Sequence, residues 1–332
     1  MGDLRLTAAT GDYDQTRDLA LGRVRPVGID LTVLNYDVEE IFFRFHDRLE
    51  WDVSELSMGM YTSAISRGDN RFIAIPVFPS RYFRHSSIYV RPDGNIRRPE
   101  DLTGKRVGFP QWSQTAGVYV RGYLAETIGV DLTSIDWVQA GVNDPGREEP
   151  STLKLPKGIK IRSVADRSLN DMLISGDIDA MITARAPNSF MERTGQIARL
   201  FPDYRAAEED YFRQTQIFPI MHTIAIRRDV YEANRWIARN LFKAFEEAKD
   251  RSVARMLDAT AAHVPIPWSL DLAERAGLGL VFKKGGFWPY GVKDNMPTLD
   301  AFLRFAFDQG TTHRRLSIED IFAEEALAEI RV

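Results

Sequence analysis

Residues 72–86 read FIAIPVFPSRYFRHS, an apolar run that leads directly into a cationic segment. The first part, residues 72–78, has the composition of a strand bounded by proline. Arg81, Arg84 and His85 follow it within a few residues. Ligands of open α/β sheets bind beyond the carboxyl ends of the strands. This stretch therefore predicts a strand and, next to it, one wall of a binding cleft.

On the N-terminal side of this stretch, strand-like runs alternate with helical patterns, as they do in an α/β domain. Each connection has about the length that a βαβ crossover requires. The expected strands are residues 4–9, 29–34 and 53–56, and the expected helices are residues 13–22, 39–49 and 58–67.

On the C-terminal side a second α/β series follows. The expected strands are residues 105–109, 135–139, 159–164 and 180–183, and the expected helices are residues 115–128, stopped by Gly129, and 168–175. Residues 141–158 are rich in glycine, proline and charge, and we interpret them as an exposed insertion.

The chain then returns and becomes helical. Residues 218–227 are expected to form one long strand, and residues 229–250 one helix with a capping box of Asp229 and Glu232. The whole pattern predicts an α/β protein of two lobes with a central cleft and a helical C-terminal tail. The first lobe comprises residues 1–86 and 218–332, and the second lobe residues 87–217.

Composition excludes several classes of protein. With 43 Lys and Arg against 47 Asp and Glu among 332 residues, the net charge of −4 makes nucleic acid an unlikely partner. The absence of cysteine excludes disulfides, thiolate metal sites and a cysteine nucleophile. No stretch approaches the roughly 18 apolar residues of a membrane span. The N-terminal sequence lacks the pattern of a signal peptide, which predicts a cytoplasmic protein.

The common cofactor and hydrolase motifs are also missing. The chain has no GxxxxGK[ST], GxSxG or HExxH motif, and Phe282 stands where a dinucleotide fingerprint would have its third glycine. The five histidines show no HxH or HxxxH spacing. No cofactor and no metal site are therefore expected, although distant ligands could converge on a divalent metal.

The cationic segment supplies the first candidate residues. Arg81 or Arg84 would clamp a carboxylate, and His85 would move a proton near neutral pH. His222 lies in the otherwise apolar run of residues 218–227. If that strand crosses between the lobes, His222 faces the cleft beside His85; the alternative is a hydrogen-bonded histidine of the core.

The segment before the predicted helix at residue 115 supplies a second group. Ser113, Gln114 and Thr115 offer side-chain and backbone donors to an anion at the helix N-terminus, although Ser113 or Thr115 would serve equally as a plain helix cap. Trp112 would stack on an aromatic ligand or fill the core. Further candidates, for which packing or turn formation is the competing interpretation, are Asp14 with Tyr13, Glu55 with Ser57, Arg185, Trp288 and Tyr290.

Several of these motifs together resemble one known family, the 4,5-dihydroxyphthalate decarboxylases. The resemblance rests on residues 72–86, on FPIMHT at 218–223 with IRRDVYE at 226–232, and on FWPYG at 287–291. It implies a fold like that of type II periplasmic binding proteins. It also implies a non-oxidative carboxy-lyase that converts 4,5-dihydroxyphthalate, a small aromatic carboxylate, to protocatechuate and carbon dioxide.

For such a reaction we expect His85 and His222 to share the proton transfers, with Asp14 or Glu55 in reserve. An arginine that held the departing carboxylate would oppose its loss, so Arg81, Arg84 or Arg185 should hold the retained one. Trp112 or Trp288 would stack on the ring. The alternative function is a solute-binding protein or sensor for a small aromatic carboxylate, and a homo-oligomer stays open.

Overall fold

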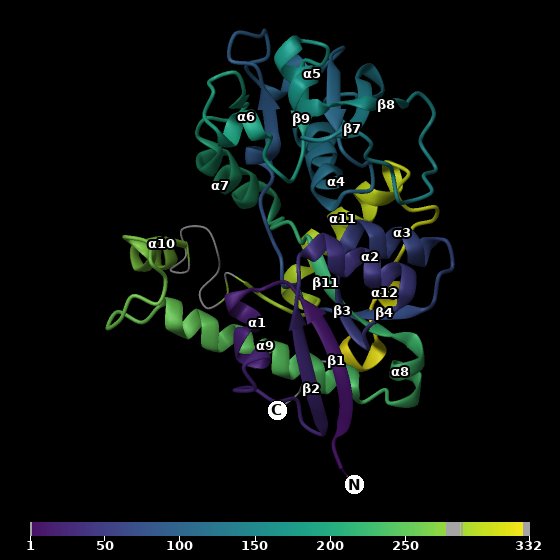
Figure 1. Ribbon diagram of the computed structural model, residues 1–332, viewed down its shortest axis with the longest axis vertical. Coiled ribbons are helices and arrows are strands. Elements are labelled where there is room, and N and C mark those ends of the chain that lie inside the picture. Colours follow the sequence, from purple (N-terminus) through teal and green to yellow (C-terminus); the bar gives the residue numbers. More distant parts are fainter. Residues whose placement is uncertain (1, 277–285, 287, 328–332) are drawn as a thin grey trace.

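The computed structural model describes residues 2–276, 286 and 288–327, and it contains two β-sheets, one in each half of the molecule (Figure 1). The first sheet has the strand order β2-β1-β3-β11-β4. β1 pairs in parallel with β2 and β3, whereas β11 is antiparallel to both β3 and β4. Its strands are β1 (Leu4–Thr10), β2 (Ile29–Asn35), β3 (Val53–Ser57), β4 (Phe72–Ile75) and β11 (His222–Arg227).

The second sheet has the strand order β10-β5-β9-β6-β7-β8. β9, β6, β7 and β8 are parallel, and β5 is antiparallel to β9 and to β10. Its strands are β5 (Ile88–Val90), β6 (Arg106–Phe109), β7 (Asp136–Gly141), β8 (Lys160–Ser168), β9 (Ala180–Ile182) and β10 (Ala198–Arg199). Since each sheet takes its strands from one of the two chain regions assigned to the lobes, we keep the names first lobe and second lobe.

Two neighbouring segments connect the lobes. The Tyr82 N–H donates to the Pro219 carbonyl (3.2 Å) and the Met221 N–H to the Ser80 carbonyl (2.9 Å), so the outgoing and returning chains run side by side. The prediction of one strand over residues 218–227 is wrong, because β11 begins at His222. Likewise β4 ends at Ile75, before Pro76. Pro76 and Pro219 have no N–H to donate, which limits regular pairing on either side of them.

Helices cover both sheets. In the first lobe they include α1 (Asp14–Ala20), α2 (Val38–Arg48), α3 (Met58–Ser66), α8 (Arg228–Ala233), α9 (Ile237–Met256), α10 (Ser269–Arg275), α11 (Met296–Asp308), α12 (Ile318–Ile321) and α13 (Glu324–Leu327); in the second they include α4 (Thr115–Gly122), α5 (Leu169–Ser175), α6 (Asn188–Met191) and α7 (Tyr204–Thr215). After α4 the chain continues as a π-helix, Tyr123–Ile128, and Gly129 ends it with a φ of 85°, as predicted.

The prediction of a single helix over residues 229–250 is wrong. Two helices, α8 and α9, are separated at Asn234, whose φ of −148° is not helical. Asp229 does not form the expected capping box, because its carboxylate pairs with Arg227. Asparagine competes for backbone hydrogen bonds through its own side chain, which disfavours it inside helices.

The segment 141–158 is not simply an exposed insertion. Ser151 is buried, and the Glu149 carboxylate accepts hydrogen bonds from the backbone of Trp112 and Ser113 in the loop before α4. The Lys154 N–H donates to the Gly310 carbonyl just after α11. Hydrogen bonds at Glu149 and at Lys154 therefore hold this segment against the rest of the protein, next to the space between the lobes.

The tail also contributes to both lobes. The core of the first lobe includes Phe302 and Phe305 of α11, which pack on Tyr119 of α4 with ring centroids 5.3 and 6.3 Å apart. The second sheet has hydrophobic clusters of its own. In the described part of the chain, no helix has the length and apolar character needed to cross a membrane.

Candidate active site

A cavity of about 370 Å³ opens between the two lobes. Strand ends and helix N-termini from both lobes surround it, which is where ligands bind in α/β folds. Its lining residues are Val38, Glu39, Phe42, Phe43, Ser57, Met60, Arg84, Gln111, Ser113, Gln114, Thr115, Ala116, Arg147, Pro150, Ala184, Arg185, Met221 and His222.

His222 enters this cavity from the first residue of β11. The antiparallel register pairs His222 with Ser57 of β3, so Glu55, two residues away on β3, points to the same face of the sheet. The His222 Nδ1 lies 2.6 Å from a Glu55 carboxylate oxygen. With Nδ1–H donated to the carboxylate, Nε2 becomes the ring nitrogen available to a ligand.

Glu55 itself is fully buried and accepts two further hydrogen bonds. The Gly11 N–H and the Tyr13 hydroxyl each donate to the carboxylate at 2.8 Å. Gly11 makes this arrangement possible, because a Cβ at that position would lie 2.8 Å from the Tyr13 ring. Burial, followed by the charge of Glu55, raises the pKa of Tyr13, so the hydroxyl keeps its proton and stays a donor.

Arg84 differs from the other cations of the cavity. Its Nε contacts the Met221 sulfur at 3.2 Å, and its guanidinium lies 4.9 Å from the centre of the Tyr82 ring. Among the described residues, no carboxylate lies within ion-pair distance of it. Burial lowers the pKa of Arg84 to about 10, which still leaves it charged at neutral pH. Glu208 acts on Arg84 only beyond ion-pair distance, so a carboxylate ligand in the cavity would be a direct ion-pair partner for it.

The loop before α4 lines the cavity, but its anion-binding groups are already occupied. The backbone N–H groups of Trp112 and Ser113 and the Ser113 hydroxyl all donate to Glu149. The Thr115 hydroxyl accepts from the Gly59 N–H at 2.9 Å. Neither Ser113 nor Thr115 caps α4, whose N-cap residue is Gln114. Ser113, Gln114 and Thr115 therefore shape the wall, while Glu149 takes the predicted anion position.

The structure corrects the placement of His85. It is 5% exposed and lies outside the main cavity, with its ring 4.4 Å from Tyr123 and 5.2 Å from Tyr211. Neither ring nitrogen has a hydrogen-bond partner in the described part of the chain, and burial lowers the pKa of His85 to about 4. An uncharged histidine enclosed by aromatic rings is poorly placed to exchange protons with a ligand of the cleft.

Arg81 and Trp112 also turn away from the cavity. Arg81 is buried and donates to the carbonyls of Phe218 and Pro289 and to Asn295, which leaves its guanidinium little capacity for a substrate. The Trp112 indole donates to the Gln309 carbonyl, and the Arg121 guanidinium lies 3.8 Å from its ring centre. Neither side chain lines the main cavity, which corrects the expectation that the two residues lie in the binding cleft.

The two aromatic candidates of the C-terminal segment lie elsewhere. Trp288 and Tyr290 line a separate cavity of about 220 Å³ beside α9. The Trp288 indole donates to the Phe78 carbonyl (3.1 Å), and Tyr290 is 5% exposed. The structure therefore brings neither the predicted stacking residue Trp288 nor the predicted substrate-binding residue Tyr290 to the main cavity.

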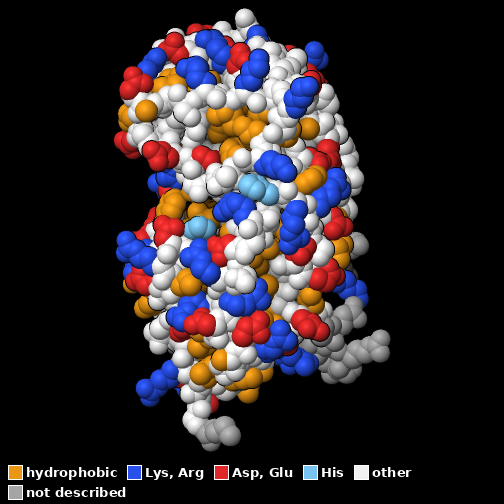
Figure 2. All heavy atoms as spheres, turned by 90° about the vertical axis from the view of Figure 1, so that its right-hand side faces the viewer, with side chains coloured by type: hydrophobic (Ala, Val, Ile, Leu, Met, Phe, Trp, Pro, Cys, Tyr) orange, Lys and Arg blue, Asp and Glu red, His pale blue; other side chains and the backbone are white. Residues whose placement is uncertain are grey.

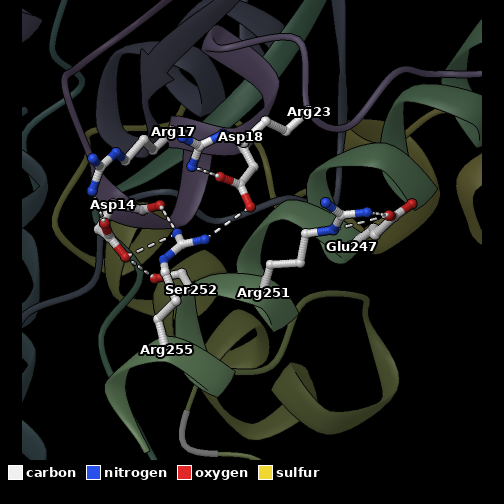
Figure 3. Close-up of polar contacts among 8 residues, drawn as sticks. All are labelled: Asp14, Arg17, Asp18, Arg23, Glu247, Arg251, Ser252 and Arg255. Carbon is white, nitrogen blue, oxygen red and sulfur yellow. Dashed lines mark hydrogen bonds and ion pairs between the residues drawn. The ribbon is translucent and has the colours of Figure 1, made fainter. Parts of the chain in front are cut away.

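Asp14 lies on α1 and faces α9, away from the cavity. Figure 3 shows its carboxylate turned toward Ser252 and Arg255 of α9, with Arg17 beside it. Partial burial raises the pKa of Asp14, but the hydrogen bonds from Ser252 and Arg255 outweigh this effect, so the net pKa is lowered. The residue contributes to the packing of α1 on α9, and this corrects its candidacy as a reserve base.

Asp14→Asn is therefore expected to leave catalysis nearly unchanged. Exposed ion pairs contribute roughly 0–1 kcal/mol to stability, so we expect a small loss of thermal stability and kinetic constants within about two-fold of wild type. Steady-state kinetics and a thermal melt of the purified variant measure both. A ten-fold loss of kcat with an intact melting curve would return Asp14 to the catalytic candidates.

Sequence reasoning missed the apolar wall of the cavity and three of its polar residues. Arg147 was not predicted because its segment was interpreted as an exposed insertion. Gln111, whose side-chain oxygen accepts from the Arg147 guanidinium (3.0 Å), lies in the loop where only the residues from 112 to 115 were chosen as candidates. Glu39 looked like an ordinary acidic residue in the first turn of α2. Figure 2 shows positive and negative side chains interspersed over one face of the molecule, so surface charge alone marks no site there.

The described residues contain no group of three or more His, Cys, Asp or Glu side chains arranged to hold a metal ion.

Of the predicted site residues, the structure brings His222, Arg84, Arg185, Ser113, Gln114 and Thr115 to one cavity and places Glu55 directly behind His222. Their roles stay predictions.

Comparison with known proteins gives two curated relatives. No family model matches the chain. A 4,5-dihydroxyphthalate decarboxylase from Comamonas testosteroni is 38% identical over 333 aligned positions, covering 100% of both chains. A 4,5-dihydroxyphthalate decarboxylase from Pseudomonas putida is 39% identical over 214 positions, covering 64% of this chain and 83% of the relative.

Among solved structures, the periplasmic aliphatic sulphonate binding protein from Escherichia coli is similar in fold. It superimposes with a TM-score of 0.55 at 14% identity, covering 98% of this chain and 99% of that one. At this identity the similarity concerns the fold alone. It confirms the predicted two-lobed architecture of the periplasmic-binding-protein type.

Proposed function

The chain belongs to the 4,5-dihydroxyphthalate decarboxylase family, and on this premise we propose that it removes one carboxylate from 4,5-dihydroxyphthalate, releasing carbon dioxide and protocatechuate. The observation that carries the proposal is the pairing of two features in one cavity: a histidine backed by a buried carboxylate, and an arginine without a carboxylate partner among the described residues. The cytoplasmic location and a homo-oligomer stay predictions from the sequence.

The reaction replaces a carbon–carbon bond by a carbon–hydrogen bond, so one proton must reach the ring carbon that bears the departing carboxylate. Protonated His222 donates this proton from Nε2 while Glu55 holds Nδ1–H. The hydroxyl para to that carbon stabilises the positive charge that develops in the ring. The carbon–carbon bond then breaks, its electron pair restores the aromatic ring, and neutral carbon dioxide leaves.

Arg84 holds the carboxylate that stays on the ring. Its attraction is equally strong before and after bond cleavage, so it anchors the substrate without opposing the reaction. His222 and Arg84 reach the cavity from neighbouring stretches of the chain, since Arg84 contacts the side chain of Met221, the residue before His222. A ring anchored by Arg84 therefore lies beside the proton donor. The aromatic ring contacts the apolar wall formed by Phe42, Met60 and Met221.

The direct test is to incubate the purified protein with 4,5-dihydroxyphthalate and to follow carbon dioxide and protocatechuate together. Equal amounts of both products are expected. Phthalate, which has the two carboxylates but no hydroxyl, is the matched control and should bind without turnover. Calorimetric binding of 4,5-dihydroxyphthalate without any product would instead identify a binding protein or sensor.

Tyr13→Phe tests the support behind His222. The variant keeps the ring against Gly11 but removes one of the three donors to Glu55. A hydrogen bond of this kind is worth about 0.5–1.5 kcal/mol, so kcat should fall by roughly ten-fold or less.

Phthalate should bind to Tyr13→Phe with nearly the wild-type Kd, because the substitution changes none of the residues that line the cavity. Steady-state kinetics with 4,5-dihydroxyphthalate and calorimetry with phthalate measure the two effects. Weaker phthalate binding in step with the fall in kcat would indicate a general structural defect, and an unchanged kcat would contradict the role of Tyr13 in supporting Glu55 and His222.

A further inference from the structure

Beside His222 and Arg84, the cavity wall contains an ion-pair cluster that joins the two lobes. Glu39, in the first turn of α2, faces two arginines of the second lobe. Its carboxylate lies 3.2 Å from the Arg147 guanidinium and 4.0 Å from the Arg185 guanidinium. All three side chains line the cavity that holds His222. We call them the Glu39 cluster.

In this cluster a carboxylate of the protein occupies the place where two guanidinium groups would otherwise receive a ligand carboxylate. Arg84, on the same cavity, has no such partner among the described residues. A substrate with two adjacent carboxylates brings two negative charges into the cavity. When one of them binds Arg84, its neighbour on the ring comes under the influence of Arg147, Arg185 and Glu39.

The charge balance of the departing group decides what this arrangement does. The departing carboxylate is negative in the bound substrate, and the carbon dioxide that it becomes is neutral. Attraction by free arginines would therefore stabilise the bound substrate more than the transition state, and it would slow the reaction. A negative charge placed among these arginines reduces that attraction.

We propose, building on the decarboxylase function above, that Glu39 determines how the departing carboxylate is held: its single negative charge offsets part of the positive charge of Arg147 and Arg185, so that they admit an aromatic dicarboxylate and bind the departing group only weakly. Glu39 thus weakens substrate binding and raises kcat. Arg147 is kept in position for this by Gln111, whose side-chain oxygen accepts from its guanidinium at 3.0 Å.

The test is Glu39→Gln, which removes the charge and keeps the shape. Two quantities are measured: the Kd of phthalate by calorimetry, and kcat and KM for 4,5-dihydroxyphthalate. We expect the Kd and the KM to fall by about ten-fold, since partly exposed charges near 4 Å apart interact appreciably, and kcat to fall by a similar factor. The ratio kcat/KM should change little.

Glu40→Gln is the matched control. Glu40 is the next residue of α2, pairs with Arg44 and does not line the cavity, so the same loss of charge should leave all three constants unchanged. Adding Arg147→Gln to Glu39→Gln should return the Kd of phthalate toward the wild-type value, because one of the freed arginines is then gone.

Weaker or unchanged phthalate binding in Glu39→Gln would overturn the proposal and make Glu39 a structural clamp between the lobes. Tighter binding without a fall in kcat would overturn the part that concerns the departing group. Absence of carbon dioxide release by the wild type is a different result: it removes the proposed function, and phthalate calorimetry alone then decides whether Glu39 opposes the binding of a dicarboxylate.

Discussion

His222→Ala should lower kcat for 4,5-dihydroxyphthalate by roughly a hundred- to ten-thousand-fold, the usual contribution of a positioned acid or base. The variant removes the imidazole that faces the cavity and leaves Glu55 buried behind an empty space. Because Arg84 is untouched, phthalate should still bind with nearly the wild-type Kd. Product formation under saturating substrate, together with phthalate calorimetry, separates the two effects.

His85→Phe is the comparison that gives this result its meaning. His85 contacts Tyr123, Phe201 and Tyr211, and its ring nitrogens find no partner among the described residues, so a phenyl ring fits the same aromatic surroundings and removes two unsatisfied polar atoms. Leaving buried polar groups unpaired is costly, and we expect unchanged kcat with an equal or higher melting temperature. A stable His85→Phe variant with a hundred-fold lower kcat would show that the proton transfers involve both histidines after all.

These two histidines show what could and could not be predicted from the sequence. His85 follows one apolar run and His222 lies within another, and both are predicted to face the cleft. What separates them is the pairing of β11 with β3, which sets His222 diagonally opposite Glu55. His85 begins a short 3₁₀ turn and is enclosed by side chains of α7 and of the π-helix after α4. Strand register and long-range packing decide this, and neither is encoded in local periodicity.

The same distinction explains the rest of the site. Alternating apolar patterns are local, so most strands of both sheets and the helices up to α5 could be predicted. The short strands β5 and β10 and the helices α6 and α7 were missed, and the predicted elements ran too far at Pro76, Pro219 and Asn234, where single residues interrupt a regular element. The pairing of Glu149 with the Ser113 loop joins residues far apart in the sequence. Neither partner has a distinctive motif, and the structure alone brings them together.

The limit of local sequence patterns is clearest in the cationic segment, because Arg81 and Arg84 are equivalent candidates by sequence. Arg81 has its hydrogen bonds filled by Phe218, Pro289 and Asn295 and belongs to the connection between lobe and tail. Arg84, three residues later, lines the cavity without a carboxylate partner in the described part of the chain. If Arg84 is the anchor, substitution of Arg84 should weaken substrate binding, whereas substitution of Arg81 should lower stability instead.

Arg84→Met should raise the KM for 4,5-dihydroxyphthalate and the Kd of phthalate by about a hundred-fold, because each hydrogen bond to a charged group is worth roughly 1.5–3 kcal/mol and methionine keeps most of the apolar stem. The fall in kcat should be smaller, since the retained carboxylate has the same charge throughout the reaction. Arg84→Lys should recover part of the affinity, as it restores the charge without the fork of donors.

Arg81→Met should act on the protein rather than on the substrate. It removes the guanidinium that donates to the Phe218 and Pro289 carbonyls and to the Asn295 side-chain oxygen, so the melting temperature should fall while the folded enzyme keeps its KM. In this assignment Arg84 alone binds the retained carboxylate, whereas Arg81, three residues earlier in the sequence, does not contact the substrate. If instead Arg84→Met bound phthalate as tightly as wild type, the anchor would have to be sought in Arg147 and Arg185, and the departing and retained carboxylates would exchange places in the cavity.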